Sequence, residues 1–118
     1  MIRWAVFAAV GLLTTPAFAQ TAAERLNDYP TVARADYVFG CMAANGQRRD
    51  ILIKCACSID HIATILPYER YTEAETVLSM QQVGGERMSF FRTSAMAKGI
   101  VSELRRAQAE AEILCFQE

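Results

Sequence analysis

The sequence predicts an all-α, disulfide-stapled small domain of four to five helices. Three observations lead to this fold class. Apolar residues recur at spacings of three and four along most of the chain after residue 31, which is the period of an amphipathic helix. No segment alternates polar and apolar residues for long enough to form a strand. The 118-residue chain also contains four cysteines, and short exported domains use disulfides to supplement a small core.

Residues 1–19 have the three parts of a secretory signal peptide. Arg3 supplies a positive charge, an apolar run follows from Trp4 to Leu13, and Ala17 and Ala19 form a small-residue cleavage site. The apolar run is shorter than the roughly 20 residues that a membrane-spanning helix needs. We therefore expect cleavage after Ala19, a periplasmic protein, and no membrane attachment after cleavage.

Residues 20–30 are polar and show no strong period, which predicts a flexible lead-in to a helical domain over residues 31–118. Thr31 is a candidate N-cap of the first helix, because its hydroxyl can accept a free backbone N–H. Asn45 and Gly46 tolerate the left-handed backbone that ends helices, so they are expected to stop it. Its predicted apolar face consists of Ala35, Val38 and Met42.

A second helix is expected between Asp50, a candidate N-cap, and Pro67, which stops it. Its length of about four turns favours a helix over a strand despite the branched isoleucines. Its apolar stripe consists of Leu52, Cys55, Ile59, Ile62 and Leu66.

Thr72 and Glu75 have the spacing of a capping box, which predicts a third helix over residues 73–82. Gly84 and Gly85 then interrupt the helical pattern. The residues expected to face inward in this helix are Ala74, Val77 and Leu78.

Two further helical stretches are predicted over residues 86–98 and 100–116, with Gly99 either ending the first or lying within one longer helix. The inward residues of the first stretch are expected to be Met88, Phe91, Ala95 and Met96. Those of the second are expected to be Ile100, Leu104, Ala107, Ala111 and Leu114.

The four cysteines allow three pairings, and helix geometry favours one of them. If the first two helices form a hairpin, Cys41 and Cys55 lie level with each other on either side of its turn. Cys57 points about 200° further round the second helix, toward a different partner. We therefore favour Cys41–Cys55 with Cys57–Cys115. The alternative is Cys41–Cys57 with Cys55–Cys115, and a Cys55–Cys57 bridge is disfavoured because it strains the helix.

Other chemistry at the cysteines needs free thiols or a different spacing. Cys57 and His61 lie one helical turn apart and, with Cys55 or Cys41, form a candidate site for a soft metal. Cys55 and Cys57 are also a candidate redox pair. The spacing does not match the C-x-x-C-H motif of covalent haem, and no nucleophile elbow accompanies Asp60 and His61. We expect no cofactor and no catalytic residue.

Tyr68 and Tyr71 are candidates for partner binding, because they follow Pro67 in a link where aromatic rings can be exposed. The chain has a formal charge of −1 and no basic tract, which argues against a nucleic-acid partner.

The cysteine pattern resembles that of an uncharacterised group of small periplasmic helical proteins encoded near PQQ-dependent methanol and alcohol dehydrogenases of bacteria. The resemblance covers roughly residues 29–116. Its motifs are Gly40-Cys41-Met42, Ala44-Asn45-Gly46, Cys55-x-Cys57-Ser58-Ile59-Asp60 and Leu104-Arg105-Arg106-Ala107-Gln108-Ala109-Glu110.

This resemblance implies a non-enzymatic accessory or binding protein with a periplasmic enzyme or protein as partner, linked to quinoprotein methanol or alcohol oxidation. One alternative is a thiol or metal handling protein that uses Cys55, Cys57 and His61. A second alternative is an inhibitor or immunity-type protein, which would form a stable complex with one enzyme.

Overall fold

The computed structural model describes residues 28–117, and over this range it is all-α with no strand. The predicted fold class is confirmed. The predicted signal peptide and residues 20–27 of the lead-in lie outside the described residues. The elements are α2 (Thr31–Asn45), α3 (Arg49–Ile65), α4 (Tyr68–Gln82), the 3₁₀ turn η1 (Glu86–Met88), α5 (Ser89–Thr93) and α6 (Ala95–Cys115).

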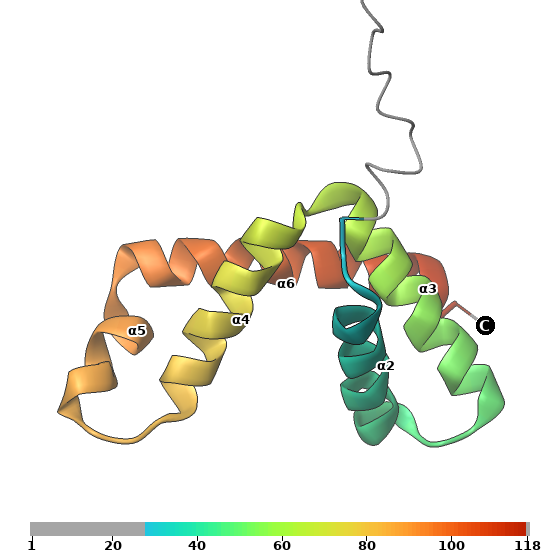
Figure 1. Cartoon of the computed structure of the whole chain (residues 1–118), viewed down its shortest axis with the longest axis horizontal. Helices are drawn as coiled ribbons and strands as arrows, with labels where there is room; N and C mark the ends of the chain where they lie inside the picture. Colours follow the sequence, from blue (N-terminus) through green and yellow to red (C-terminus); the bar gives the residue numbers. More distant parts are fainter. Residues whose placement is uncertain (1–27, 118) are drawn as a thin grey trace, which may run out of the picture.

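The long helix α6 runs along the molecule, and the other helices are arranged on it as two arms (Figure 1). One arm is the α2–α3 hairpin, and the other consists of α4 and α5. Both α3 and α4 pack against α6, whereas α2 packs against α3. The axes of α3 and α4 turn by 115° at the Pro67 corner, so the two arms diverge from that point.

The core lies where α3 and α4 meet α6. Small side chains on one face of α6 let the other helices approach closely, and Leu104 fills the space between them. The helix α2 contributes no buried residue, so it depends on its contacts with α3. The core residues are Tyr29, Ile59, Ile62, Ala63, Leu66, Tyr71, Ala74, Leu104, Ala107 and Ala111.

The end of the predicted lead-in belongs to the fold, which corrects the boundary at residue 30 for residues 28–30. The side chain of Tyr29 is 2% exposed, and its hydroxyl donates a hydrogen bond of 2.8 Å to the carbonyl of Leu66. Asp28 accepts the backbone N–H of Tyr68 at 2.9 Å. This segment therefore closes the corner between α3 and α4, a contact across about forty positions that local polarity does not reveal.

The predicted caps of the first two helices are wrong. Thr31 is the first residue of α2, which follows Pro30 and has no side-chain cap. Asp50 lies inside the first turn of α3, where its carboxylate accepts from the Arg48 guanidinium at 2.7 and 3.0 Å. A forked guanidinium forms two charge-assisted hydrogen bonds with a carboxylate, and Arg48 is close enough to make both.

The predicted capping box at Thr72 and Glu75 is also wrong, because α4 begins five residues earlier than expected, at Tyr68. The Thr72 hydroxyl donates to the carbonyl of Glu69 at 2.8 Å, as hydroxyls inside helices do. Pro67 is the residue before the helix, and Asp28, from outside the helix, accepts the N–H of Tyr68 in its first turn. Proline is well suited to the position before a first turn, which explains the early start.

The predicted boundary between residues 86–98 and 100–116 lies at Ser94 instead. Ser94 has an extended backbone, and its hydroxyl accepts the N–H of Ala97 at 3.1 Å, so α6 begins at Ala95 and contains Gly99. Three residues expected to face inward in these helices, Ala95, Met96 and Leu114, are exposed, as is Ala35 on α2. The break at Ser94 changes the direction of the chain.

No single helix within residues 28–117 is long and apolar enough to cross a membrane; α3 and α4 meet the length and composition test only as a bent pair.

Candidate functional site

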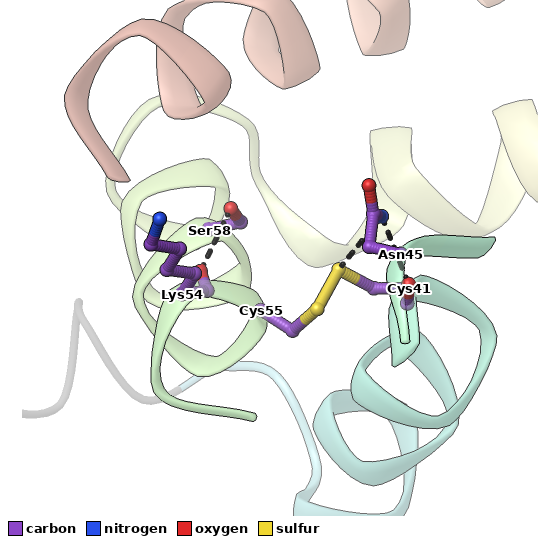
Figure 2. Close-up of a disulfide and its surroundings, with 5 residues drawn as sticks. All are labelled: Cys41, Asn45, Lys54, Cys55 and Ser58. Carbon is purple, nitrogen blue, oxygen red and sulfur yellow. Dashed lines mark hydrogen bonds between the residues drawn. A yellow bond between two sulfur atoms is a disulfide. The ribbon is translucent and has the colours of Figure 1, made fainter. Parts of the chain in front are cut away.

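Both disulfides have the predicted connectivity. Cys41 of α2 is bonded to Cys55 of α3, and Cys57 of α3 is bonded to Cys115 of α6, with Cα–Cα distances of 5.8 Å in each case. Figure 2 shows the Cys41–Cys55 bridge crossing from one helix of the hairpin to the other. The Asn45 amide donates to the Cys41 carbonyl at 2.9 Å, which holds the last turn of α2 beside the bridge.

All four cysteines are bonded, so none provides a free thiol. The metal-site hypothesis at Cys57 and His61 requires thiolate ligands, and the redox hypothesis at Cys55 and Cys57 requires a bond between those two residues or free sulfurs. In the described part of the chain, no three histidine, cysteine or carboxylate side chains are grouped to hold a metal ion. Either chemistry would therefore have to begin with reduction of a structural bridge.

His61 and Asp60 point to different neighbours, as adjacent residues on a helix must. Asp60 accepts from the Arg34 guanidinium at 2.6 Å, which links α3 to α2. The Nε2 atom of His61 is buried and has no hydrogen-bond partner within residues 28–117, although a carboxylate oxygen of Glu110 lies 3.8 Å away. The pair therefore lacks the mutual contact that a hydrolytic triad needs.

Tyr68 and Tyr71, the predicted partner-binding residues, pack against Tyr29. The ring centroids of both residues lie 5.1 Å from that of Tyr29 in tilted geometry. Tyr71 is only 7% exposed, and Tyr68 is half-buried. Their main contribution is to the packing of the α3–α4 corner, although Tyr71 also borders a groove.

A groove of about 550 Å³ is lined by residues of both arms and of α6. Every long helix contributes to it, and Phe116, which follows α6, also lines it. Its lining residues are Asp36, Tyr37, Gly40, Cys41, Ala44, Asn45, Ser58, Tyr71, Glu75, Arg105, Gln108, Glu112 and Phe116.

The base of the groove is buried and its rim is charged. Ser58 and Tyr71 are buried, and Tyr37 is half-buried beside them. The exposed charged residues of the rim come from three helices: Asp36 from α2, Glu75 from α4, and Arg105 and Glu112 from α6. The groove is therefore open to solvent, with aromatic surface underneath.

The two tyrosines of the groove remain protonated at ordinary pH. Burial raises the pKa of the Tyr37 phenol, and the nearby carboxylates of Glu112 and Glu75 raise it further. Burial is also the main cause of the raised pKa of Tyr71, with Glu75 adding to it. Both tyrosines that line the groove therefore carry neutral phenols.

Burial raises the pKa of the Glu75 carboxyl above its ordinary value, and the guanidinium of Arg105 opposes that shift without cancelling it. Arg105 itself donates to the amide oxygen of Gln108 at 3.0 Å. The negative charge of the rim is therefore only partly compensated within the groove.

Sequence reasoning missed this groove, although a signal for it is present. Asp36, Gly40 and Ala44 recur at spacings of four on α2. Glu75 follows Tyr71 at the same spacing on α4. Each set forms one helical face, but a polar helical face alone usually indicates contact with solvent.

Comparison with protein-family models, with curated proteins and with solved structures found no match to this chain.

Proposed function

We propose that this chain is a non-enzymatic accessory protein of the periplasm that binds a protein partner through the groove between its two arms. The observation that carries the proposal is the groove itself, an open site of about 550 Å³ to which α2, α3, α4 and α6 all contribute. Aromatic side chains beneath a polar rim are typical of surfaces that bind other proteins.

The disulfides support a preformed site. Cys41 lines the groove directly, and Cys115 precedes Phe116, which also lines it. The bridges thus link α2 and the end of α6 to the same helix, α3. A surface that is already ordered loses little conformational freedom when it binds, so more of the contact energy appears as affinity.

The location and the identity of the partner rest on the sequence. Two disulfides suit an oxidising compartment such as the periplasm, which agrees with the expected signal peptide. The resemblance to proteins encoded near PQQ-dependent alcohol dehydrogenases makes a periplasmic alcohol-oxidising enzyme the first candidate partner. An inhibitor or immunity-type protein would use the same groove against a different enzyme.

The experiment is affinity capture of the tagged, exported protein from the periplasm of its own bacterium, followed by reconstitution from purified components. We expect a stoichiometric complex with an alcohol-oxidising enzyme. An unrelated enzyme that is inhibited in the complex would support the inhibitor or immunity role instead. If no complex can be reconstituted, the accessory role is wrong.

A matched pair of glycines tests whether the groove is the binding surface. Gly40 lines the groove, whereas Gly99 lies on α6 outside it, and an added Cβ meets no atom within 4 Å at either position. Gly40→Gln places a side chain in the groove, and Gly99→Gln makes the same change elsewhere. Both should stabilise their helices by ~0.5–1 kcal/mol, since glycine is a poor helix former.

Only Gly40→Gln should weaken the complex, by about tenfold or more, which corresponds to ~1.4 kcal/mol. Equal affinities of the two variants would place the partner on another surface.

A further inference from the structure

We infer that the partner presents lysine or arginine side chains to the groove, which makes the groove a receptor for a basic protein segment. The inference rests on the proposed function and adds the chemistry of the partner. Three carboxylates, Asp36, Glu75 and Glu112, meet there from three different helices, and Arg105 is the one cation among the lining residues. The whole chain is nearly balanced, with 12 basic and 13 acidic residues, so this excess is local.

The three groove carboxylates have no direct side-chain partner among the described residues. Within residues 28–117, none of the three makes a side-chain hydrogen bond or an ion pair. Elsewhere in that range, Asp60 pairs with Arg34, and both Glu73 and Glu103 pair with Arg70. Glu69 and Glu86 are also unpaired at the exposed surface, but only the groove brings three such carboxylates from three helices to one site among the described residues.

The surroundings of Glu75 make this arrangement costly without a ligand. Glu75 is exposed overall, but partial burial of its carboxyl raises the pKa, so its charged form is disfavoured in the free protein. A bound cation would replace the lost solvation with a direct attraction. The titratable and charged groups that line the groove with Glu75 are Asp36 and Tyr37 on α2, Tyr71 on the same helix as Glu75, and Arg105 and Glu112 on α6.

The base of the groove suits the same occupant. The phenol rings of Tyr37 and Tyr71 lie beneath the acidic rim, and their raised pKa values keep them neutral. An ammonium or guanidinium group near an aromatic face is attracted to its π-electrons. The alkyl stem of lysine or arginine can also pack on an aromatic ring while its charged end reaches the rim.

The open form of the groove favours a side chain of a partner over a free small amine. Sites for small molecules enclose most of the ligand surface, whereas here the carboxylates are on the exposed rim. A side chain that projects from a protein surface enters such a groove from solvent while the rest of the partner covers the rim.

The test measures binding of three probes to the purified, processed protein by heteronuclear NMR and calorimetry. The first probe is an acetylated and amidated peptide of alternating glycine and lysine. The second is the same peptide with glutamine in place of lysine, and the third is n-butylammonium chloride. We expect only the lysine peptide to bind strongly, to shift the resonances of groove residues, and to lose affinity as the salt concentration rises.

Two double variants with the same change in net charge provide the decisive comparison. Glu75→Gln with Glu112→Gln removes two carboxylates from the groove. Glu69→Gln with Glu86→Gln removes two exposed carboxylates outside it, and neither of these side chains makes an ion pair within the described residues. The groove variant should lose about tenfold or more in affinity for the lysine peptide, and the control less than about twofold. Circular dichroism checks that both remain helical.

Each contrary result overturns the inference in a different way. Equal losses in the two double variants would indicate general charge attraction and no groove site. If butylammonium binds as tightly as the peptide, the occupant is a small amine. If the natural partner is captured normally by the groove variant but lost by Gly40→Gln, the groove still binds the partner and the basic segment is wrong. If no partner is captured by any form, the proposed function fails first.

Discussion

Cys55 and Cys57 lie two positions apart on α3, but their sulfurs are bonded to different helices. The Cys55 sulfur holds α2 through Cys41, and the Cys57 sulfur holds the end of α6 through Cys115. The two positions point about 200° apart around a helix, so one short segment of α3 reaches two neighbours. Cys55 is 0% exposed, whereas Cys57 lies at the surface.

This difference in exposure predicts the order in which the bridges open. Thiol–disulfide exchange requires a reductant to reach a sulfur atom, so Cys57–Cys115 should be reduced first by dithiothreitol under native conditions. Timed alkylation followed by peptide mass analysis would show labelled Cys57 and Cys115 before labelled Cys41 and Cys55. Simultaneous labelling of all four would mean that the fold opens as a whole before either bridge is attacked.

The two bridges should also differ in their contribution to stability. The sequence separations are 14 and 58 residues, for which the loop-entropy model gives ~3 and ~4 kcal/mol respectively. We expect denaturant unfolding to show a larger loss for paired serine replacement of Cys57 and Cys115 than for that of Cys41 and Cys55. The reverse order would show that packing of α2 on α3, which the Cys41–Cys55 bridge maintains, outweighs chain entropy.

Removal of the Tyr29 hydroxyl should destabilise the corner between α3 and α4. Tyr29→Phe keeps the aromatic packing but leaves the buried Leu66 carbonyl without this donor. A lost buried hydrogen bond of this kind costs ~1–2 kcal/mol. Tyr68→Phe is the matched control, because within the described residues the Tyr68 hydroxyl makes no hydrogen bond. Equal unfolding free energies for the two variants would contradict the role of the Tyr29 contact.

The position of the cap of α6 predicts that two alanine substitutions differ in their effect on stability. Ser94→Ala removes the hydroxyl that accepts from Ala97 and should cost ~1 kcal/mol. Thr72→Ala changes a residue inside α4 and should be nearly neutral, because alanine has the higher helix propensity. Thermal unfolding of both variants compares the cap observed at Ser94 of α6 with the capping box predicted at Thr72 of α4. A larger loss at Thr72 would support the capping box.

The raised pKa of Glu75 predicts that neutralising this residue stabilises the fold at neutral pH. Because burial raises the pKa in the folded state, the folded chain holds this proton more tightly than the unfolded chain does. The contribution of Glu75 to stability therefore increases as pH falls through the raised value, and becomes constant below the ordinary value. Glu75→Gln should raise the melting temperature at pH 7, with the difference from wild type shrinking toward about pH 3.

The control for this prediction is Glu69→Gln, at an exposed carboxylate on the same helix that does not line the groove. Its melting temperature should follow that of the wild type across the same pH range. A stabilisation by Glu75→Gln that persists unchanged at acidic pH would show that charge at this position is not its cause.

The sequence predicted the elements whose cause is local. Apolar spacing along residues 50–66 and 100–116 identified α3 and most of α6, and the same spacing placed Cys55 toward the first helix of the hairpin. The starts of helices were predicted less well. Capping depends on which acceptor binds the free N–H groups of the first turn. At α4 the Tyr68 N–H donates to Asp28, which lies forty positions away in the sequence.

The groove residues were harder to predict because each helical face has an ordinary explanation. Asp36 and Glu75 look like solvated positions on α2 and α4, and Tyr71 looks like a core residue or an exposed anchor. The order of residues does not reveal that these faces line one groove. Their placement depends on the 115° turn between α3 and α4, which sets the angle between the two arms.

By itself, the sequence determined the helical class and the faces of the longest helices, because these follow from spacings of three and four within one segment. Together with the assumption of a hairpin, it also selected the cysteine pairing that the structure contains. Only the tertiary structure decided that Tyr29 belongs to the core and that three carboxylates line one groove with no side-chain partner in the described part of the chain. Whether a charge is paired depends on its distances to all other charges, and those distances exist only after the helices have packed.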